Sequence, residues 1–248
     1  MNIGNPIIEL EKIDSTNKYV LRLLDKNKRF DEGTVIAADF QYAGKGQDKN
    51  QWESEAGKNL TLSIVLQPIF MKIEKQFMLN KIIALSVFSF INSFGIKNTS
   101  IKWPNDIYIG NKKVAGILIN NTIQGNLYEY CVAGLGININ QEKFNSNAPN
   151  PISIKQISGK EYNIYECLNT LCSITQEWYN NLKNEKTNII NTAYIEALFQ
   201  YNKYCKYIIR GKSVKAKITG ISEYGRLILQ TKENETYSCD FKEIEFVI

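Results

Sequence analysis

The segment that decides the fold is KWPNDIYIGNKKVAGIL, residues 102–118. Its apolar stretches at 107–109 and 114–119 are typical of strands, and the Gly110-Asn111 pair between them favours a tight turn. Pro104 has no N–H to donate, so it interrupts the strand that precedes it. The segment therefore predicts a β-hairpin that follows a proline-broken strand.

Charged side chains gather around this predicted hairpin. Lys102 and Asp106 precede it, and Lys112 and Lys113 follow its turn. If these groups face a ligand, they form a cationic site with one carboxylate. If they face water, the lysines are solvated turn residues and Asp106 is an ordinary turn former. The hairpin alone leaves both interpretations open.

Outward from the hairpin, the apolar pattern alternates between strand and helix periods, which predicts an α+β fold with a mixed sheet flanked by helices. Further strands are expected at residues 7–13, 34–38, 60–66, 99–102 and 127–135. The stretch 60–66 alternates like a half-buried strand. Helices are expected after Ser15 or Thr16 and at residues 73–94, 163–182 and 189–199.

The last part of the chain has a different pattern. From Cys205 onward, short β-rich segments are separated by Gly211, Gly220 and Gly225, which predicts a small β-barrel. We therefore expect two domains, 1–202 and 203–248.

The composition of the 248 residues, 44% hydrophobic and 22% charged, is that of a folded globular protein. Serine and asparagine interrupt the longest apolar stretch, 82–96, so no membrane span is expected. The first residues do not resemble a signal peptide, which favours the cytoplasm. The chain has no histidine, and this excludes histidine-based nucleophilic relays and histidine-ligated metal sites. Its five cysteines form no CxxC pair and are expected to be reduced thiols.

The net charge is +5, and the 30 basic residues include only four arginines. A phosphate site in this chain must rely mainly on lysine and on backbone N–H groups. A nucleic-acid-binding protein is the alternative from another class, but neither a basic stripe nor an aromatic stacking motif supports it.

Two glycine-bearing segments are candidates for close approach to a ligand. Residues 41–46, QYAGKG, lack the spacing of a P-loop and by themselves indicate only a surface loop. The stretch Gly134-Leu135-Gly136 is equally consistent with a tight strand exit.

Taken together, the motifs resemble the biotin-protein ligase family in order and spacing. They are Asp14–Asn17, Gln41–Gly46, Trp52, Lys102–Asp106, Lys113–Gly116 and Gly134–Asn138. The resemblance implies a class II synthetase-like catalytic domain, an SH3-like C-terminal barrel, and a two-step reaction. Biotin and ATP give biotinyl-5′-AMP and pyrophosphate, and a lysine of a biotin carboxyl carrier protein then takes the biotin. Lipoate-protein ligases and other acyl-adenylate ligases share the fold and are the nearer alternative.

Position by position, the resemblance also implies site roles. Lys113, Lys102 and Asp106 would be catalytic, with Mg²⁺ expected near Asp106. The residues implied in ATP or adenylate binding are Trp52, Asn105, Asn138 and Lys102. The residues implied in biotin binding are Ser15, Thr16, Asn17, Gln41, Lys45, Gly46, Gln47, Lys113 and Gly116.

The glycine-rich loop departs from the family pattern, which is rich in arginine there. This chain has Gln47 and Asp48, and a carboxylate at that position would repel phosphate. Since the first motif begins near the start of the chain, we expect a single-function ligase that binds no specific DNA. A homodimer is left open.

Overall fold

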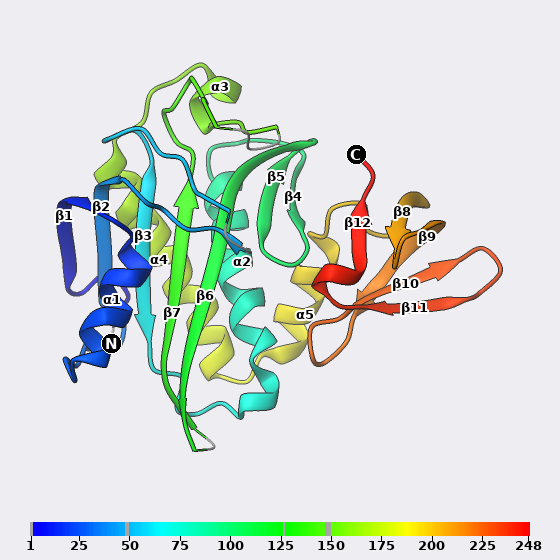
Figure 1. The fold of residues 1–248 in the computed structure, drawn as a ribbon, viewed down its shortest axis with the longest axis horizontal. Helices are drawn as coiled ribbons and strands as arrows, with labels where there is room; N and C mark the ends of the chain where they lie inside the picture. Colours follow the sequence, from blue (N-terminus) through cyan, green and yellow to red (C-terminus); the bar gives the residue numbers. More distant parts are fainter. Residues whose placement is uncertain (1, 48–49, 126, 147–149) are drawn as a thin grey trace.

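The computed structural model describes residues 2–47, 50–125, 127–146 and 150–248, so Asp48 lies outside the described residues. Figure 1 shows a large sheet packed against helices and a smaller group of strands near the C-terminus. Within the described residues, the large sheet has seven strands in the order β1-β2-β3-β7-β6-β5-β4. These strands are β1 (Ile7–Ile13), β2 (Val35–Gln41), β3 (Leu60–Leu66), β4 (Thr99–Lys102), β5 (Asp106–Ile109), β6 (Lys112–Gln124) and β7 (Leu127–Ile137).

The large sheet is mixed, as the sequence predicts. Strands β1 and β2 are parallel because helix α1 (Thr16–Asp25) forms the crossover between them. The other neighbouring pairs in this sheet are antiparallel.

Helices cover both faces of the sheet. Helix α1 packs on one face over a cluster that includes Val20, Ile36 and Val132. The other face is covered by α2 (Phe77–Asn92) and α4 (Ile164–Lys183), with α5 (Thr187–Glu196) beside α2 (Figure 1). All seven residues of β3 are consequently buried, so the expectation of a half-buried strand is wrong.

Two further helical segments differ from expectation. The helix predicted at 73–94 is divided into a short 3₁₀ segment, η2 (Ile73–Lys75), and α2, with Gln76 at the junction. A short helix, α3 (Ile154–Ser158), precedes α4 and begins with a capping box between Ser153 and Gln156.

The predicted hairpin is confirmed as β5 and β6, and Gly110 adopts a φ of 58° in its turn. Asp106 pairs with Gly116, whereas Tyr108 pairs with Lys113, because a bulge lies between Ile107 and Tyr108. Residues two apart on a strand share a face, as do directly paired residues. The side chains of Asp106, Tyr108 and Lys113 therefore lie on the same side of the hairpin.

The C-terminal sheet is antiparallel, with five strands in the order β11-β10-β9-β8-β12 within the described residues. Its elements are β8 (Cys205–Ile209), β9 (Lys212–Ile221), β10 (Leu227–Thr231), β11 (Thr236–Cys239), the 3₁₀ segment η3 (Phe241–Glu243) and β12 (Ile244–Phe246). The barrel docks on the larger part of the chain: the indole of Trp103 donates to the carbonyl of Gly225 at 2.9 Å. Gly225 also lies against the ring of Phe77, where a Cβ atom would lie 2.6 Å from Cγ.

Two general features complete the fold. Cys131, Cys167, Cys172 and Cys239 are buried free thiols in the described chain, and Cys205 is a partly exposed one. No helix among the described residues is both long enough and apolar enough to cross a bilayer.

Candidate functional site

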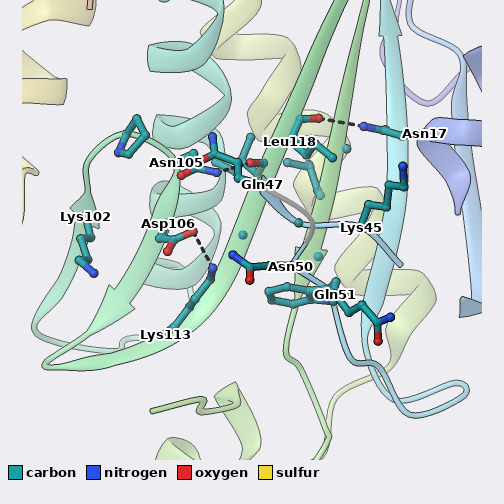
Figure 2. A pocket seen from close by; sticks show the side chains of 18 of the residues that line it. Asn17, Lys45, Gln47, Asn50, Gln51, Lys102, Asn105, Asp106, Lys113 and Leu118 are labelled. Atoms are coloured by element: carbon teal, nitrogen blue, oxygen red, sulfur yellow. Dashed lines mark hydrogen bonds and ion pairs between the residues drawn. The ribbon is translucent and has the colours of Figure 1, made fainter. Parts of the chain in front are cut away.

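A cavity of about 560 Å³ lies where α1, strands β6 and β7, the 41–52 loop, the β4–β5 turn and the barrel meet. Figure 2 shows Asn17 and Lys45 on one side of it and Lys102, Asp106 and Lys113 on the other. The sequence-derived site residues that line it are Ser15, Thr16, Asn17, Gln41, Lys45, Gly46, Gln47, Trp52, Lys102, Asn105, Asp106, Lys113 and Gly116. Segments more than 200 residues apart in the chain thus meet in a single cavity.

At the start of α1, the cavity is lined by uncharged polar side chains, and we call this its neutral end. The side-chain oxygen of Gln41 accepts from the backbone N–H of Thr16 at 2.7 Å and lies 3.2 Å from the Thr16 hydroxyl. Ser15 is the N-cap of α1, yet within the described residues its side chain makes no capping hydrogen bond. Its hydroxyl is therefore not engaged in capping α1.

Ser63 on β3, which no sequence motif singled out, contacts the residues of this end from the sheet. Its hydroxyl oxygen lies 2.7 Å from the hydroxyl oxygen of Thr16 and 2.5 Å from the side-chain oxygen of Asn17. Ser63 has no exposed surface. The available signal was the pair of polar residues Thr61 and Ser63 in the otherwise apolar β3, and a sequence pattern alone does not show what such residues contact.

The amide of Asn17 is held on both sides. Its nitrogen donates to the carbonyl of Leu118 at 2.9 Å (Figure 2). It also donates to Asn120 Oδ1 at 3.1 Å. Gly134 on β7 makes room for it, because a Cβ atom there would lie 2.5 Å from Asn17 Oδ1. Asn17 is therefore fixed by the sheet. Gly134 is required because any larger residue would collide with the Asn17 side chain.

Trp52 packs into the cavity between two glycines. A Cβ atom on Gly136 would lie 2.5 Å from the indole nitrogen, and one on Gly116 would lie 3.1 Å from the ring. The ammonium group of Lys113 lies 5.8 Å from the ring centroid. The indole nitrogen is buried and has no hydrogen-bond partner among the described residues. Gly136 is thus needed for the ring to approach the backbone of β7.

The other end of the cavity is charged. Lys113 Nζ lies 2.7 Å from Asp106 Oδ1 (Figure 2), and Lys102 Nζ donates to the Tyr108 hydroxyl at 3.3 Å. Burial lowers the pKa of Lys102, the charge of Asp106 raises it, and that of Lys113 lowers it further. Two ammonium groups against one carboxylate leave this end cationic. Lys112, by contrast, is exposed at the turn.

The two asparagines implied in nucleotide binding have different positions. Asn105 lines the cavity, and its amide donates to the carbonyl of Ile117 at 2.6 Å, which ties the β4–β5 turn to β6. Asn138 lies outside the cavity lining, and its amide donates to the carbonyl of Ile152 at 3.0 Å. Its side-chain oxygen is buried without a partner in the described chain. Contact between Asn138 and adenine stays a prediction.

The barrel also contributes to the cavity, which the sequence analysis did not anticipate. Its lining residues are Phe241, Lys242, Ile244, Glu245 and Phe246, from η3 and β12. No local pattern in these residues points to a ligand. Their role depends on how the barrel docks, which is a long-range property of the fold.

The described residues contain no group of three or more carboxylate or cysteine side chains placed to hold a metal ion. Asp106 Oδ1 is already engaged by Lys113. The described residues therefore do not offer a metal cage of their own at this position.

Comparison with known proteins agrees with this geometry. The family model described as "Biotin/lipoate A/B protein ligase family" matches residues 9–138, and "Biotin protein ligase C terminal domain" matches residues 202–244. The bifunctional ligase/repressor BirA of Bacillus subtilis is 26% identical over 97% of this chain and 74% of its own length. The BirA of Escherichia coli is 31% identical over 59% of this chain and 44% of its own length.

Solved structures show the same fold. The biotin protein ligase from Aquifex aeolicus in complex with biotin and ATP superposes with a TM-score of 0.79 at 25% identity, covering 96% of this chain and 97% of that one. The Leishmania major enzyme in complex with biotinyl-5-AMP has a TM-score of 0.61 at 19% identity, covering 94% of this chain and 98% of that one. The first family model alone spans more than half of the sequence. The chain belongs to the biotin/lipoate A/B protein ligase family.

Proposed function

We propose that this protein is an ATP-dependent biotin-protein ligase. It joins biotin and ATP to give biotinyl-5′-AMP and pyrophosphate, and then transfers the biotinyl group to a lysine of a biotin carboxyl carrier protein. The observation that carries the proposal is a single cavity with a neutral polar end and a cationic end. The relatives support it, since the similar Aquifex aeolicus structure holds both biotin and ATP.

The neutral end suits the ureido ring of biotin. That ring needs donors for its carbonyl and acceptors for its two N–H groups, and Ser15, Thr16 and Gln41 supply hydroxyl and amide groups there. A dithiolane ring, as in lipoate, offers no N–H or carbonyl group to the Ser15 hydroxyl, which makes no capping hydrogen bond. Leaving buried polar groups unpaired costs about 1–3 kcal/mol each, so the polar network favours biotin over lipoate.

The cationic end suits the step that makes the adenylate. The biotin carboxylate attacks the α-phosphorus of ATP, a C–O–P bond forms, and pyrophosphate leaves. Two anions must approach each other, so positive charge is needed where they meet. We assign this role to Lys113, with Lys102 beside the departing phosphates and Asp106 orienting Lys113 through their ion pair. Magnesium, in this proposal, arrives as the chelate of ATP.

The second step needs little further chemistry from the chain. The neutral amine of the carrier lysine attacks the carbonyl carbon of the adenylate, the C–O bond to AMP breaks, and the nitrogen loses a proton. AMP is a good leaving group, so positioning and exclusion of water are the main requirements. Trp52 and the loop around Lys45 and Gly46 line the cavity where that intermediate would sit.

The test is exchange of labelled pyrophosphate into ATP, with biotin or lipoate as the acid. Biotin-dependent exchange, followed by transfer of biotin to an apo carrier domain, supports the proposal. Exchange that requires lipoate would mean that lipoate, and not biotin, is the substrate. No exchange with either acid would refute the ligase assignment. Since the two acids differ in their ring, the neutral end of the cavity is the part under test.

The same proposal includes expectations on cellular location, DNA binding and oligomeric state. We propose a cytoplasmic protein without sequence-specific DNA binding, and we leave a homodimer open. Mobility shifts with a biotin-operon promoter fragment and random DNA test the second point. A biotin-dependent preference for the promoter would contradict it. Sedimentation with and without biotin and ATP tests for a dimer.

A further inference from the structure

Lys102 is held between two aromatic rings that come from different parts of the chain. Its ammonium nitrogen lies 5.0 Å from the centroid of Tyr108, on the neighbouring strand β5. It lies 5.4 Å from the centroid of Phe246, on β12 at the end of the barrel. Both distances are in the range of cation–π contact.

Phe246 is itself fixed in place by the barrel. It pairs with Tyr207 in the β8–β12 ladder, and the two rings meet edge to face at 5.4 Å. The ring of Phe199 lies 6.2 Å from Phe246 and 5.6 Å from Tyr108, so it connects both sides of the Lys102 position. The barrel thus places an aromatic ring at a cavity whose other walls belong mainly to the larger part of the chain.

We propose that Phe246 is a positioning residue for nucleotide binding. Its ring replaces water around the ammonium group of Lys102 and holds that group toward the cavity, where it meets the phosphates of ATP. The proposal rests on the proposed function, since it assigns a role within the same site. An ammonium group in water must lose part of its hydration shell before it meets a phosphate. Next to two ring faces, much of that shell is already absent, and the remaining attraction to an anion is stronger.

The electrostatic surroundings of Lys102 fit this role. The charged groups on neighbouring strands are Asp106, on β5, and Lys113, on β6, which form an ion pair with each other. Lys242 and Glu245 line the cavity from the barrel. Burial is the largest influence on the pKa of Lys102 and lowers it, and the ring of Phe246 contributes to that burial.

Steady-state pyrophosphate exchange in the full-length protein tests the proposal, with ATP and biotin varied separately. Phe246→Ala should raise the KM for ATP roughly three- to thirtyfold, the range of a cation–π contact, and leave the KM for biotin within about twofold. Phe246→Leu should give an intermediate value because it restores apolar cover without a ring. Phe246→Tyr should behave as the unaltered protein. Val247→Ala is the matched control, since Val247 is the next residue, is 44% exposed and does not line the cavity.

An unchanged KM for ATP in Phe246→Ala would overturn the proposal, and so would equal rises in both KM values, which would indicate a general loss of structure. Thermal melts identify an unfolded variant, and Phe246→Leu then carries the test. A second readout does not need ligase activity: acetylation of Lys102 by acetic anhydride, followed across pH by mass spectrometry. Its midpoint should move to higher pH in Phe246→Ala, and an unmoved midpoint would contradict the proposal. If the unaltered protein lacks biotin-dependent exchange, the proposed function fails while this labelling still reports on Lys102.

Discussion

Replacing Lys113 with alanine is expected to remove most adenylation activity and to leave the fold intact. Its ammonium group lies 2.7 Å from Asp106, and its side chain is 28% exposed at the cavity. Two unit charges about 4 Å apart at an effective dielectric constant of about 20 attract by about 4 kcal/mol, which corresponds to roughly a thousandfold in rate. The fold should lose less, because a partly exposed ion pair contributes about 1 kcal/mol or less.

The assay is biotin-dependent pyrophosphate exchange beside a thermal melt. Lys112→Ala is the matched control, because Lys112 is the adjacent residue and is exposed at the turn. Lys113→Arg should also be impaired, since a planar guanidinium places its charge at a different depth. If folded Lys113→Ala retained exchange within about tenfold of the unaltered protein, the transition state would not depend on this charge and the assignment would be refuted.

Three further outcomes are expected. Ser63→Ala should raise the KM for biotin about tenfold and leave that for ATP unchanged, because Thr16 and Asn17 lose a shared buried partner; equal effects on both substrates would contradict this. Gly136→Ala should displace the indole of Trp52, visible as a red-shifted tryptophan emission, whereas an unaltered spectrum would contradict the close packing. Burial lowers the pKa of Lys81 to about 8, so between about pH 8 and 10.5 the unfolded chain binds more protons and stability should rise with pH. Lys81→Met should flatten that rise in thermal melts, and an unchanged slope would exclude Lys81 as its source.

Much of the fold could be predicted because its signals are local. The Gly110-Asn111 turn and the apolar stretches on either side specify the β5–β6 hairpin within a few residues. The predicted helix α4 was also correct within about two residues, since Asn163 caps it and its apolar period is regular. The full burial of β3 could not be predicted from its alternation of polar and apolar residues. Thr61 and Ser63 are buried polar residues whose hydrogen-bond partners come from other segments.

The candidate site likewise contains residues that local motifs predict and residues that only the fold brings in. Residues that carry a recognisable motif, such as Lys102–Asp106 and Lys113, could be predicted and do line the cavity. Ser63 and Phe246 carry no motif, and each enters the site through contacts with residues far away in the sequence. Asn138 shows the converse: its motif is clear, yet its amide bonds to Ile152 outside the cavity lining.

The hairpin also sets the separation between the neutral end and the cationic end of the cavity. Strand β6 carries Lys113 near its start and reaches Leu118, whose carbonyl accepts from Asn17, only five residues later. At about 3.4 Å per residue, this spans roughly 17 Å. Gly116 stands between the two ends, and its missing side chain gives Trp52 the space to lie against the strand. A single strand therefore sets the distance between the charged end and the neutral end, and a shift in its register would move both ends of the site together.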